Sequence, residues 1–202
     1  MRHTFLRHIS LVGAVTAAVA CSDVTGPGSG AFVQVQLTDA PADVIASAEV
    51  WISKVYLVPG SDSSHQVVLF ENSSAPQHYD LLTLRDSLTA DLTDTFEVPA
   101  GTYHQLRLVV DSARVTLVEG MQFDGGGSSR SLKVPSGSTS GIKVQLASPV
   151  EAAEGTVTTI LVDFDVEQNF KLQGNPDSPG GIRGILFTPT LVEKRRGQAA
   201  TS

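Results

Sequence analysis

Cysteine is almost missing from this chain of 202 residues, in which Cys21 is the only one. One cysteine excludes an intramolecular disulfide and a cysteine-rich zinc site, so packing alone has to hold the core together. Histidine is sparse as well, and His65, His78 and His104 are too far apart in sequence to form a metal-ligand pair on one helix or strand. No Gly-x-Ser-x-Gly elbow occurs either, so the sequence offers no convincing catalytic constellation.

Basic residues are outnumbered, since 14 Lys and Arg against 21 Asp and Glu give a net charge of −7. This balance lacks the clustered positive charge typical of nucleic-acid binders, so no nucleic-acid partner is expected. The only basic cluster, Lys194-Arg195-Arg196, lies near the C-terminal end and is interpreted as part of a solvated terminus. Aromatic residues make up 6% of the chain, which leaves few of them outside the core.

The apolar stretch from Ile9 to Ala20 is too short for a membrane-spanning helix, which needs about 20 apolar residues. Arg2 and Arg7 give the segment a basic start, and small residues end it directly before Cys21. This layout predicts a signal peptide over residues 1–20, and therefore an exported protein.

Cys21 stands at the position that bacterial lipoprotein processing modifies. Its thiol can carry a diacylglyceryl thioether, after which the new N-terminus is acylated, for example with palmitate, and two or more chains make anchoring stable. We therefore expect membrane lipid to be a partner through Cys21. Ala18 stands where a lipobox commonly has leucine, and Ala18-Val19-Ala20 also fits ordinary secretory cleavage, so soluble export is the alternative. Ser22, in place of a retention aspartate, favours the outer membrane over the inner one in a Gram-negative host.

The remaining chain divides by composition into three parts. Residues 21–30 are rich in Gly, Pro and Ser and predict a flexible tether that follows the lipidated cysteine. Residues 31–193 have the length of one ordinary domain, placed in the periplasm or at the cell surface. Residues 194–202 are predicted to be a disordered polar tail.

Hydrophobic residues recur with period two, and no long stretch carries a helical period. In the first such stretch Val33, Val35 and Leu37 alternate with Gln34 and Gln36, as a half-buried strand requires. Turn residues separate the short strands, so we expect an all-β fold, an antiparallel β-sandwich of immunoglobulin-like or transthyretin-like two-sheet architecture with at most one or two short helical turns. The predicted strands cover residues 32–38, 50–58, 66–70, 79–84, 95–98, 103–110, 113–117, 142–146, 158–166 and 182–191.

Five ordered motifs resemble a known family. They are Val35-Gln36-Leu37-Thr38-Asp39-Ala40-Pro41, Val98-Pro99-Ala100-Gly101-Thr102-Tyr103, Leu106-Arg107-Leu108, Leu132-Lys133-Val134-Pro135-Ser136-Gly137 with Ser140-Gly141-Ile142-Lys143, and Leu161-Val162-Asp163-Phe164-Asp165. Together they look like the bacterial and archaeal domain of unknown function 4382, over about Phe32 to Leu191. The resemblance implies an exported protein, often a lipoprotein. It implies no catalytic residues, because the family has no settled activity.

Asp163 and Asp165 are the strongest polar pair, since two residues apart on a strand their carboxylates would share one face. Calcium prefers oxygen ligands of this kind, and Asp39 could supply a further one. The same spacing would also suit the acid and base of a glycoside hydrolase. The favoured interpretation is an ordinary solvent face or hydrogen bonding to loop amides, with no metal site.

Aromatic side chains offer a second candidate site, because a flat ring with a polar edge can stack on a sugar. The candidates are Trp51, Tyr56, Tyr79 and Tyr103. Trp51 is expected to share a face with Val55 and Leu57, which favours a core role, and His104 is expected on the face of Leu106.

The expected function is a non-enzymatic binding or structural module at the cell envelope, with a glycan or an envelope protein as partner. It follows from the anchor, the acidic domain and the lack of a reactive constellation. The alternatives are a hydrolase using Asp163 and Asp165, or a calcium-stabilised adhesion module. No other cofactor is expected.

Overall fold

The computed structural model of the chain describes residues 30–39, 43–60, 65–84, 88–134, 140–177 and 181–201. The predicted signal peptide, Cys21 and the tether up to residue 29 lie outside the described residues, so their role stays a prediction. No helix among the described residues is long and apolar enough to cross a membrane.

The fold is all-β, as predicted from the alternation of apolar and polar residues. The elements are β1 (Ala31–Thr38), β2 (Ile45–Val58), β3 (Val67–Glu71), β4 (Gln77–Asp80), η1 (Leu81–Leu84), β5 (Ala90–Asp91), β6 (Phe96–Val98), β7 (Gly101–Tyr103), β8 (Gln105–Leu117), β9 (Ser129–Leu132), β10 (Ile142–Gln145), β11 (Val150–Ala152), β12 (Thr156–Asp163), α2 (Val166–Asn169), β13 (Phe170–Gly174), β14 (Ile182–Phe187) and β15 (Leu191–Ala200). The named helical elements η1 and α2 are each a single short turn.

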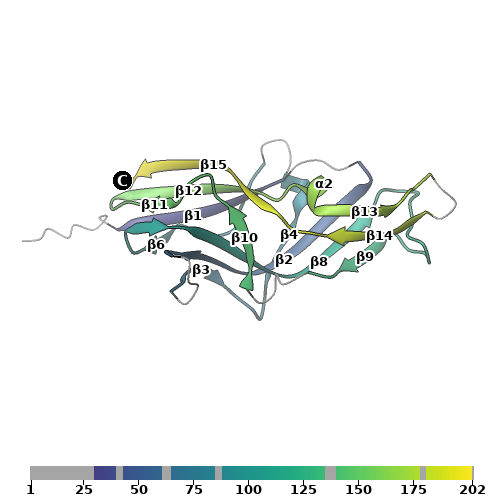
Figure 1. The fold of residues 1–202 in the computed structure, drawn as a ribbon, viewed down its shortest axis with the longest axis horizontal. Helices are drawn as coiled ribbons and strands as arrows, with labels where there is room; N and C mark the ends of the chain where they lie inside the picture. The colour runs from purple at the N-terminus through teal and green to yellow at the C-terminus, as the bar shows by residue number, and fades with distance from the viewer. Residues whose placement is uncertain are drawn as a thin grey trace, which may run out of the picture.

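A long sheet curls around the core in the order β3-β2-β8-β10-β15-β12-β1-β5, while β4, β6 and β9 pair with β2, β1 and β8. Figure 1 shows the result as an elongated molecule in which β1, β12 and β15 lie across from β2, β3 and β8. This arrangement of two facing layers is that of a β-sandwich. The pairs β7–β11 and β13–β14 form two small additional sheets.

The core is built by the alternation that the sequence shows. Val33, Val35 and Leu37 of β1 are fully buried, whereas Gln34 and Gln36 between them are only partly buried. Because successive side chains of a strand point to opposite faces, one face of β1 packs into the core and the other meets solvent.

Two strand pairs are parallel within the otherwise antiparallel sheet. β1 runs parallel to β12 from Ala31↔Thr156 to Thr38↔Asp163, and β10 runs parallel to β15 at Val144↔Leu191. Parallel neighbours need a long crossover connection, and here most of the chain lies between β1 and β12. The carboxyl ends of β1 and β12 therefore meet at one edge of the molecule.

The prediction of a disordered tail is wrong for residues 194–200. β15 continues to Ala200 and pairs with β12 from Asp163↔Val192 to Thr156↔Ala200. Polar residues are compatible with this strand because main-chain hydrogen bonds hold it to β12, while most of its side chains face solvent. The predicted last strand over 182–191 is likewise two strands, β14 and β15, that belong to different sheets.

His104 does not lie on the face of Leu106 as expected. It is exposed between β7 and β8, its amide donates to the Val58 carbonyl, and its Nδ1 lies against the Pro59 carbonyl oxygen. β7 ends at Tyr103 and β8 begins at Gln105. The alternation of inward and outward side chains therefore does not continue from Tyr103 into β8.

Candidate functional site

Asp39, Asp163 and Asp165 are brought to the same edge of the sheet by the parallel pairing of β1 and β12. Thr38 is the register partner of Asp163, and the amide of Phe164 donates to the Thr38 carbonyl at 3.1 Å. Asp39 therefore follows β1 at the level of Phe164, the residue before Asp165. The sequence predicted Asp39 only as a possible further ligand. The pairing of the β1 and β12 main chains is what brings it near Asp163 and Asp165.

Each of the three carboxylates hydrogen-bonds main-chain amides around α2. Asp39 is buried, and its Oδ1 accepts from the Val166 amide at 2.8 Å. Asp165 is the N-cap of α2, and its Oδ1 accepts from the Gln168 amide at 3.0 Å. Asp163 accepts from the Asp165 amide at 3.4 Å, and its Oδ2 lies 3.3 Å from Lys194 Nζ. These contacts satisfy the free amides at the start of a helical turn.

The expectation that Asp163 and Asp165 share one strand face is wrong. β12 ends at Asp163, and Asp165 has a positive φ of 37°, which turns the chain into α2. Alternation holds only within an extended strand, so the spacing of two no longer places both carboxylates on one side. Within the described residues, no group of three or more His, Cys, Asp or Glu side chains is arranged to hold a metal ion.

Asn169, at the end of α2, is a structural residue that the sequence did not reveal. Its side chain is fully buried, its Nδ2 donates to the carbonyls of Phe164 and Thr190, and its Oδ1 accepts from the Thr190 amide at 2.8 Å. The carboxamide thus joins α2 to the segment that enters β15. Only the contrast between a polar residue and its apolar neighbours, Val166 and Phe170, could have drawn attention to it.

Trp51 lies on the outer face of the sheet and not in the core. The residues on either side of it, Val50 and Ile52, are fully buried, whereas Trp51 is only partly buried. The register of β2 against β8 shifts between Trp51 and Ile52 and again before Lys54. These bulges reverse the alternation, so Trp51 does not share the inward face of Val55 as the sequence predicted.

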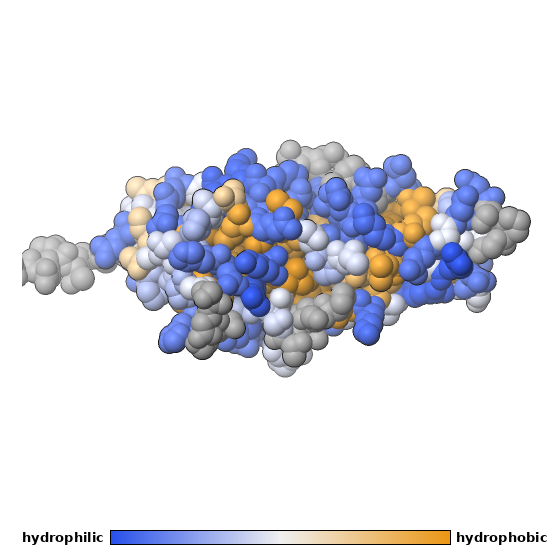
Figure 2. Space-filling view, viewed as in Figure 1, coloured by the Kyte–Doolittle hydropathy of each residue, from blue (hydrophilic) through white to orange (hydrophobic). Residues whose placement is uncertain are grey.

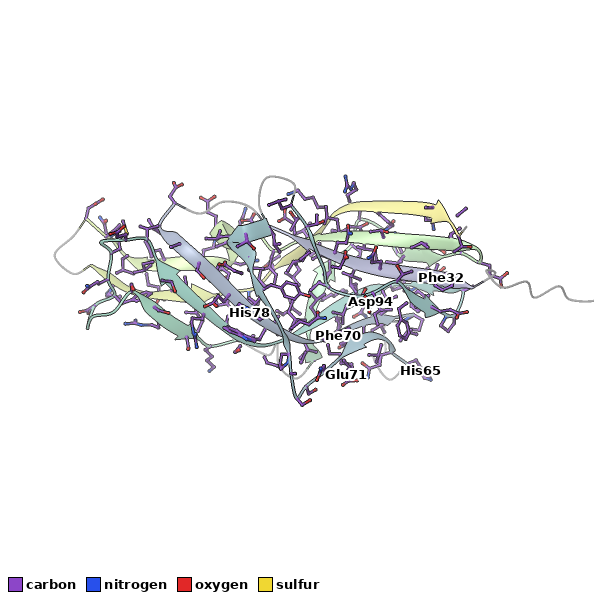
Figure 3. All side chains as sticks on the ribbon, turned by 180° about the vertical axis from the view of Figure 1, so that it is seen from behind. Phe32, His65, Phe70, Glu71, His78 and Asp94 are labelled. Atoms are coloured by element: carbon purple, nitrogen blue, oxygen red, sulfur yellow. The ribbon has the colours of Figure 1, made fainter. Side chains whose placement is uncertain are left out.

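Two side chains from the flanking strands contact the indole. His78 of β4 is the register partner of Trp51, and the two ring centroids lie 4.8 Å apart at an interplanar angle of 32°. On the other side of β2, the Arg114 guanidinium of β8 lies 5.5 Å from the indole centroid, in cation–π contact. Figure 3 shows His78 beside the long β2 strand.

Glu49 connects these groups into one polar rim. Its Oε1 lies 2.9 Å from His78 Nε2, and Arg114 is its register partner on β8. Hydroxyl groups continue the surface across the next strands, because Ser112 is the partner of Trp51 and Ser131 is the partner of Arg114. We call Glu49, Trp51, His78, Arg114, Ser112 and Ser131 the Trp51 face.

The three tyrosines of the predicted stacking platform have other roles. Tyr56 is buried and donates to the Ser140 carbonyl at 2.7 Å, and Tyr103 is buried and donates to the Pro99 carbonyl at 2.7 Å. Burial raises the pKa of Tyr103. Burial, and then the nearby Asp91 carboxylate, raise the pKa of Tyr79 from 10.0 to about 12. Trp51 alone of the four is therefore placed to meet a ligand ring.

A separate groove of about 500 Å³ lies between the turn after β2 and the turn between β6 and β7. Pro59, Val67, Pro99 and Tyr103 supply most of its apolar wall, and Gln66 and Thr102 supply polar groups. Its described lining residues include no carboxylate.

Fold and surface together define an all-β sandwich domain with a polar outer face that carries one indole. Residues 30–179 match the family described as Domain of unknown function (DUF4382). Because this match covers more than half of the chain, the protein belongs to that family, which confirms the resemblance carried by the five motifs. The match indicates no enzyme class. No curated protein and no solved structure is significantly similar to the chain.

Proposed function

We propose that this protein is an exported, lipid-anchored binding domain of the cell envelope that recognises a glycan through the Trp51 face. The observation that carries the proposal is the position of Trp51, the only tryptophan of the chain, on the solvent side of the sheet between His78 and Arg114. Trp51 is only partly buried, and the part of its ring that His78 and Arg114 leave uncovered can contact the apolar face of a sugar.

The rim supplies the polar half of sugar recognition. Glu49 accepts hydrogen bonds, Arg114 donates them from a planar fork, and the hydroxyls of Ser112 and Ser131 can do either. Main-chain pairing of β2 with β4 and β8 holds the rim residues beside one another, up to the bulge that follows Trp51. A flat face of this kind suits an extended polysaccharide more than a small molecule, which generally needs a concave pocket.

The anchor is proposed from the sequence, because Cys21 follows the apolar segment 9–20 directly. A lipid on this residue, with the Gly/Pro/Ser-rich stretch 22–30 after it, would keep the domain close to envelope polymers. Tethering of this kind raises the effective concentration of a weak binding site near its ligand.

A polysaccharide array and isolated envelope fractions would test the glycan site. The wild-type protein should bind a subset of polysaccharides, and Trp51→Ala should weaken that binding roughly tenfold or more, because stacking on the indole is lost. Trp51→Phe should keep part of the affinity. Since Trp51 is the only tryptophan, its fluorescence should also shift on binding.

Tyr79→Phe serves as the matched control, because it removes an aromatic hydroxyl from β4 next to His78 but leaves the Trp51 face unchanged. It should bind like the wild-type protein. Saturable binding that Trp51→Ala leaves intact would refute the Trp51 face as the site, and binding to no glycan at all would refute glycan recognition.

A further inference from the structure

Within the described residues, β15 has no strand partner on one side from Glu193 onward, although Glu193 and Arg196 hold residues 147–149 beside it. On one side it pairs with β12 as far as Ala200, but on the other side β10 pairs only with Leu191 and Val192. No other strand of the described chain pairs with residues 193–200. Figure 1 shows this part of β15 at the outer border of the molecule. An open strand edge offers unpaired amide and carbonyl groups to a further strand.

The C-terminal half of this edge lacks the usual protection against pairing. Gly197, Gln198, Ala199 and Ala200 carry no charge, and none is proline. In Figure 2 the corresponding end of the molecule, at the left, is pale, whereas much of the rest of this face is blue. The other edge strands are shorter, since β5 has 2 residues and β3 has 5. Short length is itself one of the ways in which edges are protected.

Two of the three basic residues that directly precede Gly197 form ion pairs within the chain. Lys194 Nζ lies 3.3 Å from Asp163, and the Arg196 guanidinium lies 2.7 Å from Glu193. Arg196 also donates to the carbonyls of Ser148 and Pro149, which fixes it beside the strand. Because these two residues are paired with carboxylates, they should repel a second β15 strand at this edge less strongly than unpaired charges would.

The sequence of β15 is complementary to itself when two copies run antiparallel with Gly197 at the centre. In that register Arg195 lies opposite Ala199 and Arg196 opposite Gln198, so no like charges face each other, and the regular part of the contact ends at the bulge at Lys194. A groove of about 340 Å³ between residues 147–148 and 193–196 would receive the partner's residues 198–200, whose alanine side chains are small. A two-fold symmetric contact requires this kind of self-complementarity.

We propose that two copies of this chain associate through their β15 strands, antiparallel about a two-fold axis at Gly197, to form one continuous sheet. The contact is independent of the Trp51 face, because β15 and β2 lie apart in the sheet order, separated by β8 and β10. It would place two glycan-binding faces in one particle.

Sedimentation of the full chain carrying Cys21→Ser tests the pairing, since this substitution removes both a lipid anchor and an intermolecular disulfide as causes of association. The chain should show a concentration-dependent monomer–dimer equilibrium. Gly197→Lys and Gly197→Glu should each weaken the dimer roughly tenfold or more, because like charges then meet at the axis. The folded protomer should tolerate both changes, since a Cβ at Gly197 meets no atom within 4 Å.

Mixing the two variants gives the decisive measurement. An equimolar mixture of the Lys and Glu chains should restore association, because opposite charges then meet across the axis. Gly60→Lys is the matched control, as a Cβ there also meets nothing within 4 Å, and it should dimerise like the parent. Four results would each overturn the proposal. The parent could stay monomeric to millimolar concentration, the Gly197→Lys chain could dimerise normally, the mixture could form no dimers, or the edge could capture a strand of a different protein.

Discussion

Replacing Asn169 by alanine should destabilise the fold far more than replacing an ordinary surface asparagine. The Asn169 side chain is 0% exposed and bonds three main-chain groups, the carbonyls of Phe164 and Thr190 and the amide of Thr190. Alanine leaves these buried groups without their partner, and one unsatisfied buried group costs about 1 to 3 kcal/mol. Allowing for relaxation, we expect a loss of about 3 to 5 kcal/mol.

Urea unfolding, followed by the fluorescence of Trp51, measures this loss directly. Asn72→Ala is the matched control, because Asn72 is exposed while its Oδ1 accepts from Ser74 Oγ and the Ala75 amide, both at 3.0 Å. Water replaces those bonds, so the control should lose about 1 kcal/mol or less. Asn169→Asp should not rescue stability near neutral pH, since an ionised carboxylate cannot donate to the two carbonyls.

Equal losses for Asn169→Ala and Asn72→Ala would refute this account of Asn169. Such a result would mean that water enters beside α2 and replaces the carboxamide. The slope of the unfolding free energy against urea concentration should stay unchanged in all three variants, because a change in slope would indicate altered compactness of a state and not a lost contact.

Two further predictions concern pH and the anchor. The unfolded chain loses the Tyr79 proton near its usual pKa of 10.0, whereas the folded chain keeps it until about 12. The free energy of unfolding should therefore fall as the pH rises through that window, by about 1 kcal/mol given the partial exposure of the ring, and Tyr79→Phe should reduce the fall seen in urea titrations. Cys21→Ser should move the protein from the membrane to the soluble fraction on cell fractionation, and a wild-type protein that is already soluble would contradict lipidation.

Alternation predicts strands well where a strand stays regular. The pattern of Ile142 and Val144 against Lys143 and Gln145 is reproduced by β10, whose first set is buried and second set exposed. The same rule fails at Asp165, because a positive φ ends the strand, and at Trp51, because bulges shift the register. Neither the turn at Asp165 nor the bulges near Trp51 produces a periodic pattern in the sequence. Each depends on how the neighbouring strand is paired.

Contacts between distant segments could not be predicted from the sequence either. Asp39 and Val166 are 127 positions apart, and their hydrogen bond exists only because β1 and β12 pair in parallel. The polar composition of residues 194–200 suggested disorder, yet β12 provides register partners for residues 195–200, beyond a bulge at Lys194. A local pattern describes the side chains of a segment and says little about which backbone will lie beside it.

The motifs that carry the family resemblance lie at the junctions of the fold. Asp39 binds the Val166 amide, the Tyr103 hydroxyl donates to the Pro99 carbonyl at the β6–β7 turn, and Arg107 donates to the Ser140 carbonyl. The contacts of Asp39 and Arg107 join segments far apart in the sequence, and that of Tyr103 closes the turn between β6 and β7. This explains why the motifs predicted the architecture and left the activity open.

The Trp51 face lies outside every one of those motifs. Its residues come from β2, β4, β8 and β9, on positions whose side chains face solvent and are free to change without disturbing the core. If the junction contacts stay the same while the residues of one sheet face differ, the same fold can carry different ligand sites. If glycan recognition resides there, proteins that share the junction motifs should differ in the polysaccharide they bind according to the residues that stand in place of Glu49, Trp51 and Arg114.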